Sequence, residues 1–186
     1  MIDLTKLANE IGTDKGNLHG EAHNYTQVYQ KYFEPLQSNP IKLLEIGIYD
    51  HRFPGASVKL WTSFFSNIEL IGFEINPDAK SLEQDNVKVF IGDQGNVDHL
   101  NECIKEYGGD YDIVIDDGIH KFEQIKTSFE VLYPYLKKGG LYIIEDIHAN
   151  DSREIESWLK DNGYEYSSYC PTFYWSAGDR LLILTK

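Results

Sequence analysis

Short apolar runs alternate with amphipathic segments along most of this chain. The apolar runs are four or five residues long and rich in Leu, Ile and Val, which is typical of buried strands. They lie at 43–46, 69–73, 87–91, 111–115 and 141–144, and two further strands are predicted at 164–169 and 181–185. Strands that alternate with helices predict an α/β fold. We expect a Rossmann-like doubly wound sheet of about seven strands, mainly parallel with an antiparallel last strand.

The segments between these runs have the periodicity of helices that bury one face. Helices are predicted at about 57–65, 97–107, 124–136 and 153–161. The helix at 124–136 is followed by Lys137, Lys138 and Gly139, which is typical of a cationic last turn with a glycine cap. No repeat or linker interrupts the pattern, so the prediction is a single domain that spans residues 1–186.

Residues 1–40 are predicted to form a helical cover on this domain. A helix at 2–10 is stopped by Gly12, and aromatic residues then recur at helical spacing from Tyr25 to Phe33. We interpret them as a stripe that faces the core. The polar residues just before the stripe are expected to fold over the carboxyl end of the sheet; they are Asp14, Lys15, His19 and His23. For Lys15, pairing with a carboxylate and contact with a cofactor both stay open.

Composition narrows the function classes. The 186 residues carry a formal net charge of −13, so nucleic acid and anionic membrane surfaces would repel the protein. The two cysteines are Cys103 and Cys170, and no apolar run approaches the roughly 20 residues that span a bilayer. We therefore expect a cytoplasmic protein with free thiols, a small-molecule partner, no nucleic acid or membrane partner, and possible homo-oligomers.

Acidic residues gather where the predicted strands end. Glu45 lies near the end of the first strand, Glu74 closes the second and Asp93 follows the third. The last two central strands end in adjacent acids, which are Asp116 with Asp117 and Glu145 with Asp146. Carboxylates at one edge of a sheet repel one another unless a cation or hydroxyl donors satisfy them. The sequence therefore predicts a ligand site at this edge, beside the loop that begins at Gly47.

The order of these acids resembles that of class I S-adenosylmethionine-dependent methyltransferases. The matching residues are Glu45 and Gly47 around the first loop, Glu74 after the second strand and Asp93 after the third. The resemblance implies that the first loop holds the methionine part of the cofactor. It implies that Glu74 accepts from both ribose hydroxyls, that Asp93 lies beside the adenine, and that Asp116 belongs to the cofactor contacts.

Longer motifs are similar to those of the metal-dependent sugar O-methyltransferases of macrolide biosynthesis. They are GTDKG at 12–16, HNYTQVY at 23–29, GAS at 55–57, IDDGIH at 115–120 and IIEDIH at 143–148. The resemblance covers about residues 10 to 150. It implies a magnesium ion held by Asp117, Glu145 and Asp146, with His120 as the general base. The implied activity is methyl transfer to a hydroxyl of a sugar or polyol-like natural product, and magnesium suits such a set of hard oxygen ligands.

Other interpretations remain open from the sequence. Asp116 and Asp117 could be caps or turn residues, and His120 could be a surface histidine. An NAD-dependent oxidoreductase or epimerase would need G-x-G-x-x-G after the first strand, and IGIYDHRFPG lacks that spacing. A non-catalytic nucleotide-binding protein of the same fold would need no metal ion.

Overall fold

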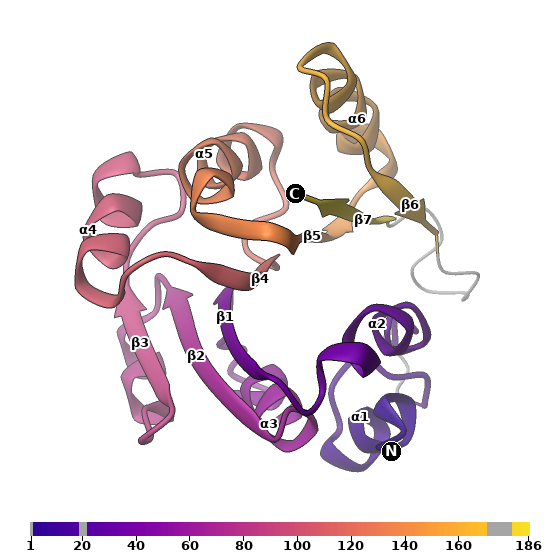
Figure 1. Cartoon of the computed structure of the whole chain (residues 1–186), viewed down its shortest axis with the longest axis vertical. Helices are drawn as coiled ribbons and strands as arrows, with labels where there is room; N and C mark the ends of the chain where they lie inside the picture. The colour runs from indigo at the N-terminus through magenta and orange to yellow at the C-terminus, as the bar shows by residue number, and fades with distance from the viewer. Residues whose placement is uncertain (1, 19–21, 171–179) are drawn as a thin grey trace.

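A mixed β-sheet forms the centre of the computed structural model (Figure 1), which describes residues 2–18, 22–170 and 180–186. Within that part of the chain the sheet has seven strands in the order β3-β2-β1-β4-β5-β7-β6. The strands are β1 (Pro40–Ile46), β2 (Asn67–Glu74), β3 (Val87–Ile91), β4 (Tyr111–Asp116), β5 (Leu136–Ile147), β6 (Ser167–Tyr169) and β7 (Arg180–Thr185). Strands β1 to β5 pair in parallel, whereas β7 is antiparallel to both β5 and β6. The predicted fold class is confirmed.

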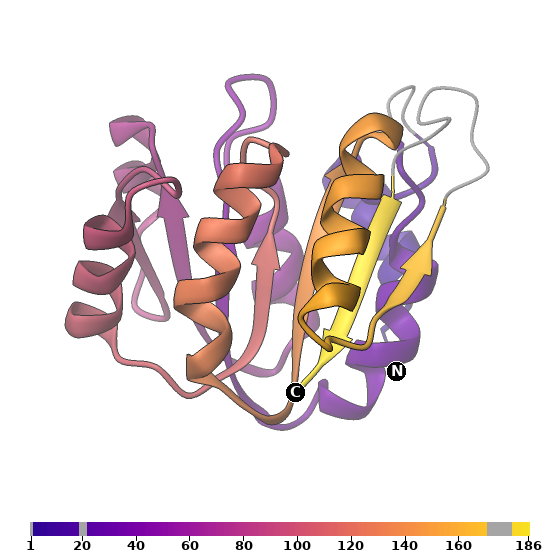
Figure 2. The same cartoon turned by 90° about the horizontal axis from the view of Figure 1, so that it is seen from above.

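Helices cover both faces of this sheet (Figures 1 and 2). One face carries α1 (Leu4–Ile11), α2 (Thr26–Phe33) and α3 (Ala56–Phe64), and the other carries α4 (Val97–Tyr107), α5 (Phe122–Leu132) and α6 (Ala149–Asp161). Short 3-10 helices are Glu34–Leu36, Pro77–Leu82 and Tyr133–Tyr135. None of the helices in the described ranges is long and apolar enough to cross a bilayer.

Alternation along each strand divides the core into two layers. In β1, Leu43 packs with the layer under α1 to α3, and its neighbour Leu44 packs with the layer under α4 to α6. The same split separates Ile113 from Val114 in β4. Side chains that point to opposite faces of a doubly covered strand are both buried, so the central strands are apolar runs without a polar face.

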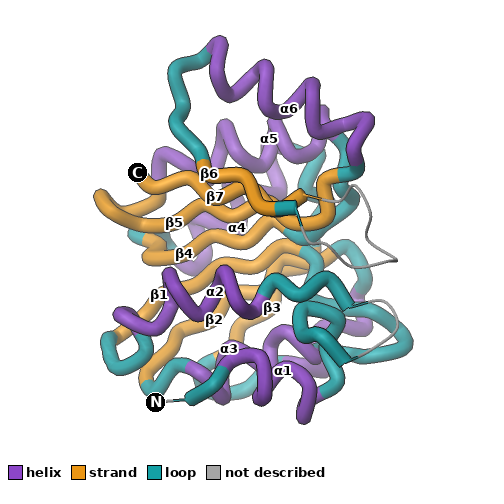
Figure 3. Tube along the Cα trace, turned by 90° about the vertical axis from the view of Figure 1, so that its right-hand side faces the viewer, coloured by secondary structure: helices purple, strands orange, loops and turns teal. Residues whose placement is uncertain are grey.

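The segment before β1 lies on the same side of the sheet as α3 (Figure 3). A cluster of aromatic rings packs the two together. The ring of Tyr29 stacks on Phe33 at a centroid distance of 4.8 Å, and both rings meet the edge of Trp61 at 5.4 and 5.5 Å. All three side chains are fully buried. The helical spacing of the aromatic residues therefore marked a stripe that faces the core, as predicted from the sequence.

The predicted helix end at residues 137–139 is wrong. Helix α5 ends at Leu132, and β5 already begins at Leu136, so the two lysines and Gly139 belong to a long strand. The cause is a non-local pairing with the end of the chain. The N–H of Gly139 donates to the carbonyl of Lys186 at 2.7 Å, and the N–H of Lys186 donates to Gly140 at 3.0 Å.

The aromatic cluster generates a stability prediction. Phe33→Ala should lower the free energy of unfolding by about 3 to 5 kcal/mol, because it leaves a cavity between Tyr29 and Trp61. Phe53→Ala removes the same side chain at a position that is 51% exposed and should change stability far less. Urea denaturation of both variants checks this. Equal losses for the two variants would contradict the assignment of the cluster to the core.

Candidate active site

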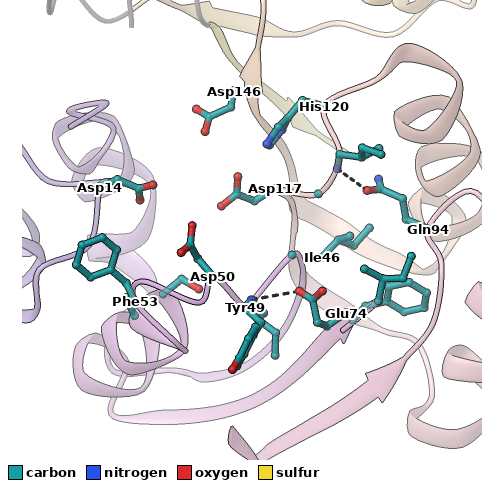
Figure 4. Close-up of a pocket in the computed structure, with 18 of the residues that line it drawn as sticks. Asp14, Ile46, Tyr49, Asp50, Phe53, Glu74, Gln94, Asp117, His120 and Asp146 are labelled. Atoms are coloured by element: carbon teal, nitrogen blue, oxygen red, sulfur yellow. Dashed lines mark hydrogen bonds between the residues drawn. The ribbon is translucent and has the colours of Figure 1, made fainter. Parts of the chain in front are cut away.

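A cavity of about 940 Å³ opens at the carboxyl edge of the sheet. It lies where β1 has β2 on one side and β4 on the other, which is the point at which open α/β sheets bind ligands. Its lining comes mainly from loops and strand ends at this edge (Figure 4). They are the segment before α2, the loop after β1, the end of β2, the end of β3, the loop after β4 and the end of β5.

Gly47 lets the loop after β1 run close to the loop after β4. Its φ is +83°, a conformation that residues with a side chain rarely adopt, and its N–H donates to the carbonyl of Phe73 at 2.9 Å. A Cβ atom at this position would clash with the backbone carbonyl of Asp117. Because position 47 carries no side chain, the loop after β1 can lie in close contact with the backbone of Asp117 at the cavity.

Glu74 and Asp93 both line the cavity at the ends of β2 and β3. The buried carboxylate of Glu74 accepts the N–H of Tyr49 at 3.2 Å on one oxygen (Figure 4) and the N–H of Asn76 at 2.9 Å on the other. Asp93 accepts the N–H of Gly95 at 2.8 Å and is exposed. Both acids are thus held by backbone donors at the positions that the sequence predicted for cofactor contacts.

Asp117, His120 and Asp146 form a group that can hold a metal ion. Each offers one ligand atom, and these atoms lie within 4.8 Å of one another (Figure 4). His120 and Asp146 have φ values of +56° and +52°, which is rare for residues other than glycine. Such backbone strain persists where the surrounding structure requires it, often at functional sites. The donor set of two carboxylates and one imidazole fits a divalent cation.

Glu145 does not belong to this group, although the resemblance to the sugar O-methyltransferases implies that it binds the same ion. Its side chain is buried, and both carboxylate oxygens have partners from the segment before β1. One oxygen accepts from the Lys15 ammonium at 2.8 Å, and the other accepts from the Tyr29 hydroxyl. The structure therefore brings Asp117 and Asp146 together, adds His120 to them, and gives Glu145 two protein partners behind the cavity.

Lys15 is buried between two carboxylates. Its ammonium group lies 2.6 Å from Asp117 Oδ2 and 2.8 Å from Glu145 Oε2. Burial alone lowers the pKa of Lys15, but these carboxylates raise it well above the usual value. Burial raises the pKa values of Asp117 and Glu145, and the charge of Lys15 acts in the opposite direction. Of the two roles left open from the sequence, the structure shows the pairing with carboxylates.

Asp116 sits behind the cavity and reaches it through a second residue. Its carboxylate accepts from Gln94 Nε2 at 3.0 Å and from the Ser128 hydroxyl, and it is fully buried. Gln94 lines the cavity and accepts the N–H of Ile119 at 2.9 Å. The cofactor role of Asp116 stays a prediction, and Gln94 is a site residue that the sequence analysis missed. Its only sequence signal is the polar loop after the third predicted strand.

Three residues of the HNYTQVY motif also reach the site. The Tyr25 hydroxyl donates to Asp146 Oδ1 at 2.6 Å, the Tyr29 hydroxyl donates to Glu145, and His23 Nδ1 lies 3.2 Å from Asp146 Oδ1. The periodic spacing of the tyrosines marks the buried rings and says nothing about their hydroxyls. The expected contact with the sheet edge is present for Asp14, Lys15 and His23, which all line the cavity, and His19 lies outside the described residues.

Glu45 is buried under the first loop and lies outside the described lining of the cavity. One of its oxygens accepts the Ser57 hydroxyl at 2.9 Å, at the start of α3. Burial raises the pKa of Glu45 to about 8, although the nearby charge of Lys15 lowers it. Glu45 therefore binds the first turn of α3 from outside the cavity lining. Its direct contact with a cofactor stays a prediction.

Comparison with solved structures shows which proteins share this fold. The fold matches the MycE methyltransferase of the mycinamycin biosynthetic pathway, in complex with Mg, SAH and mycinamycin VI, with a TM-score of 0.79 and 26% identity. That match covers 100% of this chain and 54% of the other. An O-methyltransferase from Bacillus cereus in complex with SAH, 13% identical, shares the fold with a TM-score of 0.68. The chain therefore has the fold of the class I S-adenosylmethionine-dependent methyltransferases.

Within that class the chain is homologous to sugar O-methyltransferases of macrolide biosynthesis. It is 36% identical over 148 residues to the demethylmacrocin O-methyltransferase of Streptomyces fradiae. It is 34% identical over 148 residues to the mycinamicin VI 2''-O-methyltransferase of Micromonospora griseorubida. Each match covers 78% of this chain and 36% of the relative, so the chain spans little more than a third of these proteins. No protein-family model matches the chain.

The buried carboxyl of Glu45 generates a pH prediction. Its pKa of about 8 in the folded protein lies above the usual value of about 4.5, so the folded state holds a proton that the unfolded state releases. The resulting stability is fully present below about pH 4.5 and is lost as pH rises through 8. Glu45→Gln should therefore gain stability relative to the parent between pH 6 and pH 9. Urea denaturation in EDTA checks this, and parallel pH profiles for the two proteins would contradict it.

Proposed function

We propose that this protein transfers a methyl group from S-adenosylmethionine to a hydroxyl of a sugar or polyol-like natural product, with the help of Mg²⁺. One observation carries the proposal: Glu74 and the group of Asp117, His120 and Asp146 line the same cavity at the carboxyl edge of the sheet. The homology to sugar O-methyltransferases supports the choice of reaction and acceptor class.

The end of the cavity at β2 and β3 is proposed to bind the cofactor. Each oxygen of Glu74 accepts one backbone N–H, which fixes the carboxylate and leaves lone pairs for the two ribose hydroxyls. The loop at Gly47 allows close approach of the methionine part, since no side chain stands there. Asp93 is placed one strand further along the same edge, where we propose that it lies beside the adenine.

The end of the cavity at β4 and β5 is proposed to hold the ion and the acceptor. Asp117 and Asp146 supply hard oxygen ligands, and further ligand positions are left for acceptor oxygens. Bound magnesium supplies a positive charge that lowers the pKa of an acceptor hydroxyl and orients it. His120, whose ring nitrogen lies within 4.8 Å of both carboxylates, accepts the hydroxyl proton as the methyl group is transferred.

The segment before β1 is proposed to be part of the same functional unit. We propose one domain over residues 1–186 in which residues 1–40 form a cover that closes the site on one side. The contacts of Lys15 and Tyr29 with Glu145 support this, as does the contact of Tyr25 with Asp146. A small molecule is the proposed partner, because carboxylates at this edge can bind a cation and accept hydrogen bonds from hydroxyl groups.

Glu74 provides the test of cofactor binding. Glu74→Ala should weaken binding of S-adenosylmethionine and S-adenosylhomocysteine by about 1.5 to 3 kcal/mol, because a charge-assisted pair of hydrogen bonds is lost. Glu69→Ala, on the same strand with an exposed side chain, is the matched control. Isothermal titration calorimetry measures both variants and compares the parent with NAD. Tight binding of NAD, or unchanged affinity of Glu74→Ala for the cofactor, would contradict the proposal.

His120 provides the test of catalysis. His120→Asn should lower turnover by roughly 10² to 10⁴ and keep cofactor affinity, because only proton transfer is removed. Methyl transfer from radiolabelled S-adenosylmethionine to glycosides with vicinal hydroxyls measures turnover, and chelation with EDTA should abolish it in the parent. Calorimetry with MgCl₂ separates two roles of the imidazole. If His120 is a base, His120→Asn keeps the ion affinity of the parent; if His120 is a ligand, the variant binds the ion more weakly. Normal turnover of His120→Asn would exclude both.

A further inference from the structure

A buried amide group joins the end of β4 to the loop that follows it. The side chain of Gln94 is 7% exposed, and its two polar ends have different partners. Nε2 donates to Asp116 Oδ1 at 3.0 Å, and Oε1 accepts the N–H of Ile119 at 2.9 Å (Figure 4). An ionised carboxylate only accepts and a backbone N–H only donates, so these partners fix which way round the amide lies. Gln94 thus bridges two points of the chain on either side of Asp117.

Asp116 provides the fixed end of this bridge. Its carboxylate is 1% exposed at the end of β4, a strand that is paired on both sides with β1 and β5. The Ser128 hydroxyl, which is also buried, donates to the other carboxylate oxygen from α5. A buried carboxylate that loses its donors keeps a charge without solvation, so these contacts are costly to break. The Nε2 end of Gln94 is therefore attached to the core.

The turn after β3 fixes the backbone of Gln94. The N–H of Asp93 donates to His99 Nδ1 at 3.0 Å, and the carboxylate of Asp93 accepts the N–H of Gly95 at 2.8 Å. The N–H of Asn96, the residue that caps α4, donates to the carbonyl of Asp93 at 3.0 Å. Hydrogen bonds on both sides of Gln94 therefore hold the turn from which its side chain extends.

The loop after β4 is held at two places. At its start, the N–H of Asp117 donates to the carbonyl of Ile46 on β1 at 3.1 Å. Further on, the side chain of Ile119 is 58% exposed, so its packing contributes little to the position of the loop. His120 then has a φ of +56°, a strained conformation that its surroundings must maintain. The hydrogen bond from Ile119 to Gln94 therefore holds the loop directly before His120.

Gly118 makes room for the bridge. A Cβ atom at this position would clash with Oε1 of Gln94. The backbone of Gly118 does not lie in the left-handed region, so its conformation is open to residues with a side chain. The close approach of the Gln94 amide is therefore what requires a glycine in the middle of this loop.

From these contacts we infer that Gln94 is a positioning residue for His120. Its amide group ties the N–H of Ile119 to Asp116 and so sets the backbone from which the imidazole reaches the acceptor hydroxyl. Proton transfer needs hydrogen-bond geometry, and a displacement of about 1 Å can cost on the order of 10²-fold in rate. The inference rests on the proposed function, in which His120 is the base. It leaves the ion ligands unchanged, since β1 holds the backbone of Asp117 separately.

The first arm of the test measures the bridge itself. Amide hydrogen exchange of the full chain, followed by NMR, reports the N–H groups of Ile119 and Asp117 separately. In Gln94→Met, Ile119 should exchange at least about tenfold faster than in the parent, because its acceptor is gone. Asp117 should stay within about threefold of the parent, because Ile46 still accepts its N–H. Equal exchange of Ile119 in the two proteins would overturn the inference.

The second arm measures turnover at saturating S-adenosylmethionine, MgCl₂ and a glycoside with vicinal hydroxyls. Gln94→Met should lower kcat by about 10- to 100-fold and keep the affinity for S-adenosylhomocysteine within about threefold. Gln84→Met is the matched control, because its side chain is exposed at the opposite end of β3, and it should turn over like the parent. An unchanged kcat in Gln94→Met, or a loss confined to cofactor affinity, would overturn the inference.

A double-mutant cycle separates the positioning role from a purely structural one. In the His120→Asn background, Gln94→Met should lower kcat by less than about twofold, because the group that it positions is already absent. A further loss of about tenfold or more would show that Gln94 acts through another group and would overturn the inference.

Gly118→Ala is a second variant that disturbs the bridge and keeps Gln94. The added methyl group should displace the amide and lower kcat by about 10- to 100-fold, as in Gln94→Met. This variant decides the question if Gln94→Met does not fold, and its normal turnover would contradict the inference.

The outcomes separate this inference from the proposed function. Normal turnover of His120→Asn, or a parent that does not bind S-adenosylhomocysteine, would overturn the proposed function and the inference with it. A loss of turnover in His120→Asn together with normal turnover in Gln94→Met would overturn the inference alone.

Discussion

Negative charge collected at one edge of the sheet is the constraint on which the rest of this structure depends. Parallel strands bring their carboxyl ends to the same edge, so Glu74, Asp117, Glu145 and Asp146 come together there. Bare carboxylates at such a place repel one another and lose the solvation of water. One segment supplies donors to three of these acids: Lys15 binds Asp117 and Glu145, and the hydroxyls of Tyr25 and Tyr29 bind Asp146 and Glu145.

The same segment also builds the core, which links stability to the site. The rings of Tyr29 and Phe33 pack on Trp61 in the layer that covers β1, while the Tyr29 hydroxyl reaches Glu145 at the edge. One side chain thus contributes apolar area at one end and a hydrogen bond at the other, as buried tyrosines commonly do. A change in the packing of α2 should therefore affect the acids at the end of β5. The effect is transmitted through the Tyr29 hydroxyl and needs no direct contact of α2 with a ligand.

The edge divides into two ends that suit two different ligands. At β2 and β3, Glu74 and Asp93 are held by backbone N–H groups and present acceptors for hydroxyls. At β4 and β5, two carboxylates and an imidazole converge for a cation. Gly47 joins the two ends, because the absence of a side chain lets the first loop touch the backbone of Asp117. The structurally similar MycE methyltransferase is in complex with two such ligands, Mg and SAH.

The sequence by itself determined the elements, the mixed sheet and the acids at the strand ends. These follow from local periodicity, and the motifs carried the resemblance that homology confirmed. Tertiary structure alone decided that β5 begins at Leu136 and that Asp116 is buried behind Gln94. It also decided that Glu145 faces Lys15 while its neighbour Asp146 faces the ligand group. The physical reason is that each of these outcomes depends on a partner far away in the chain, which periodicity cannot name.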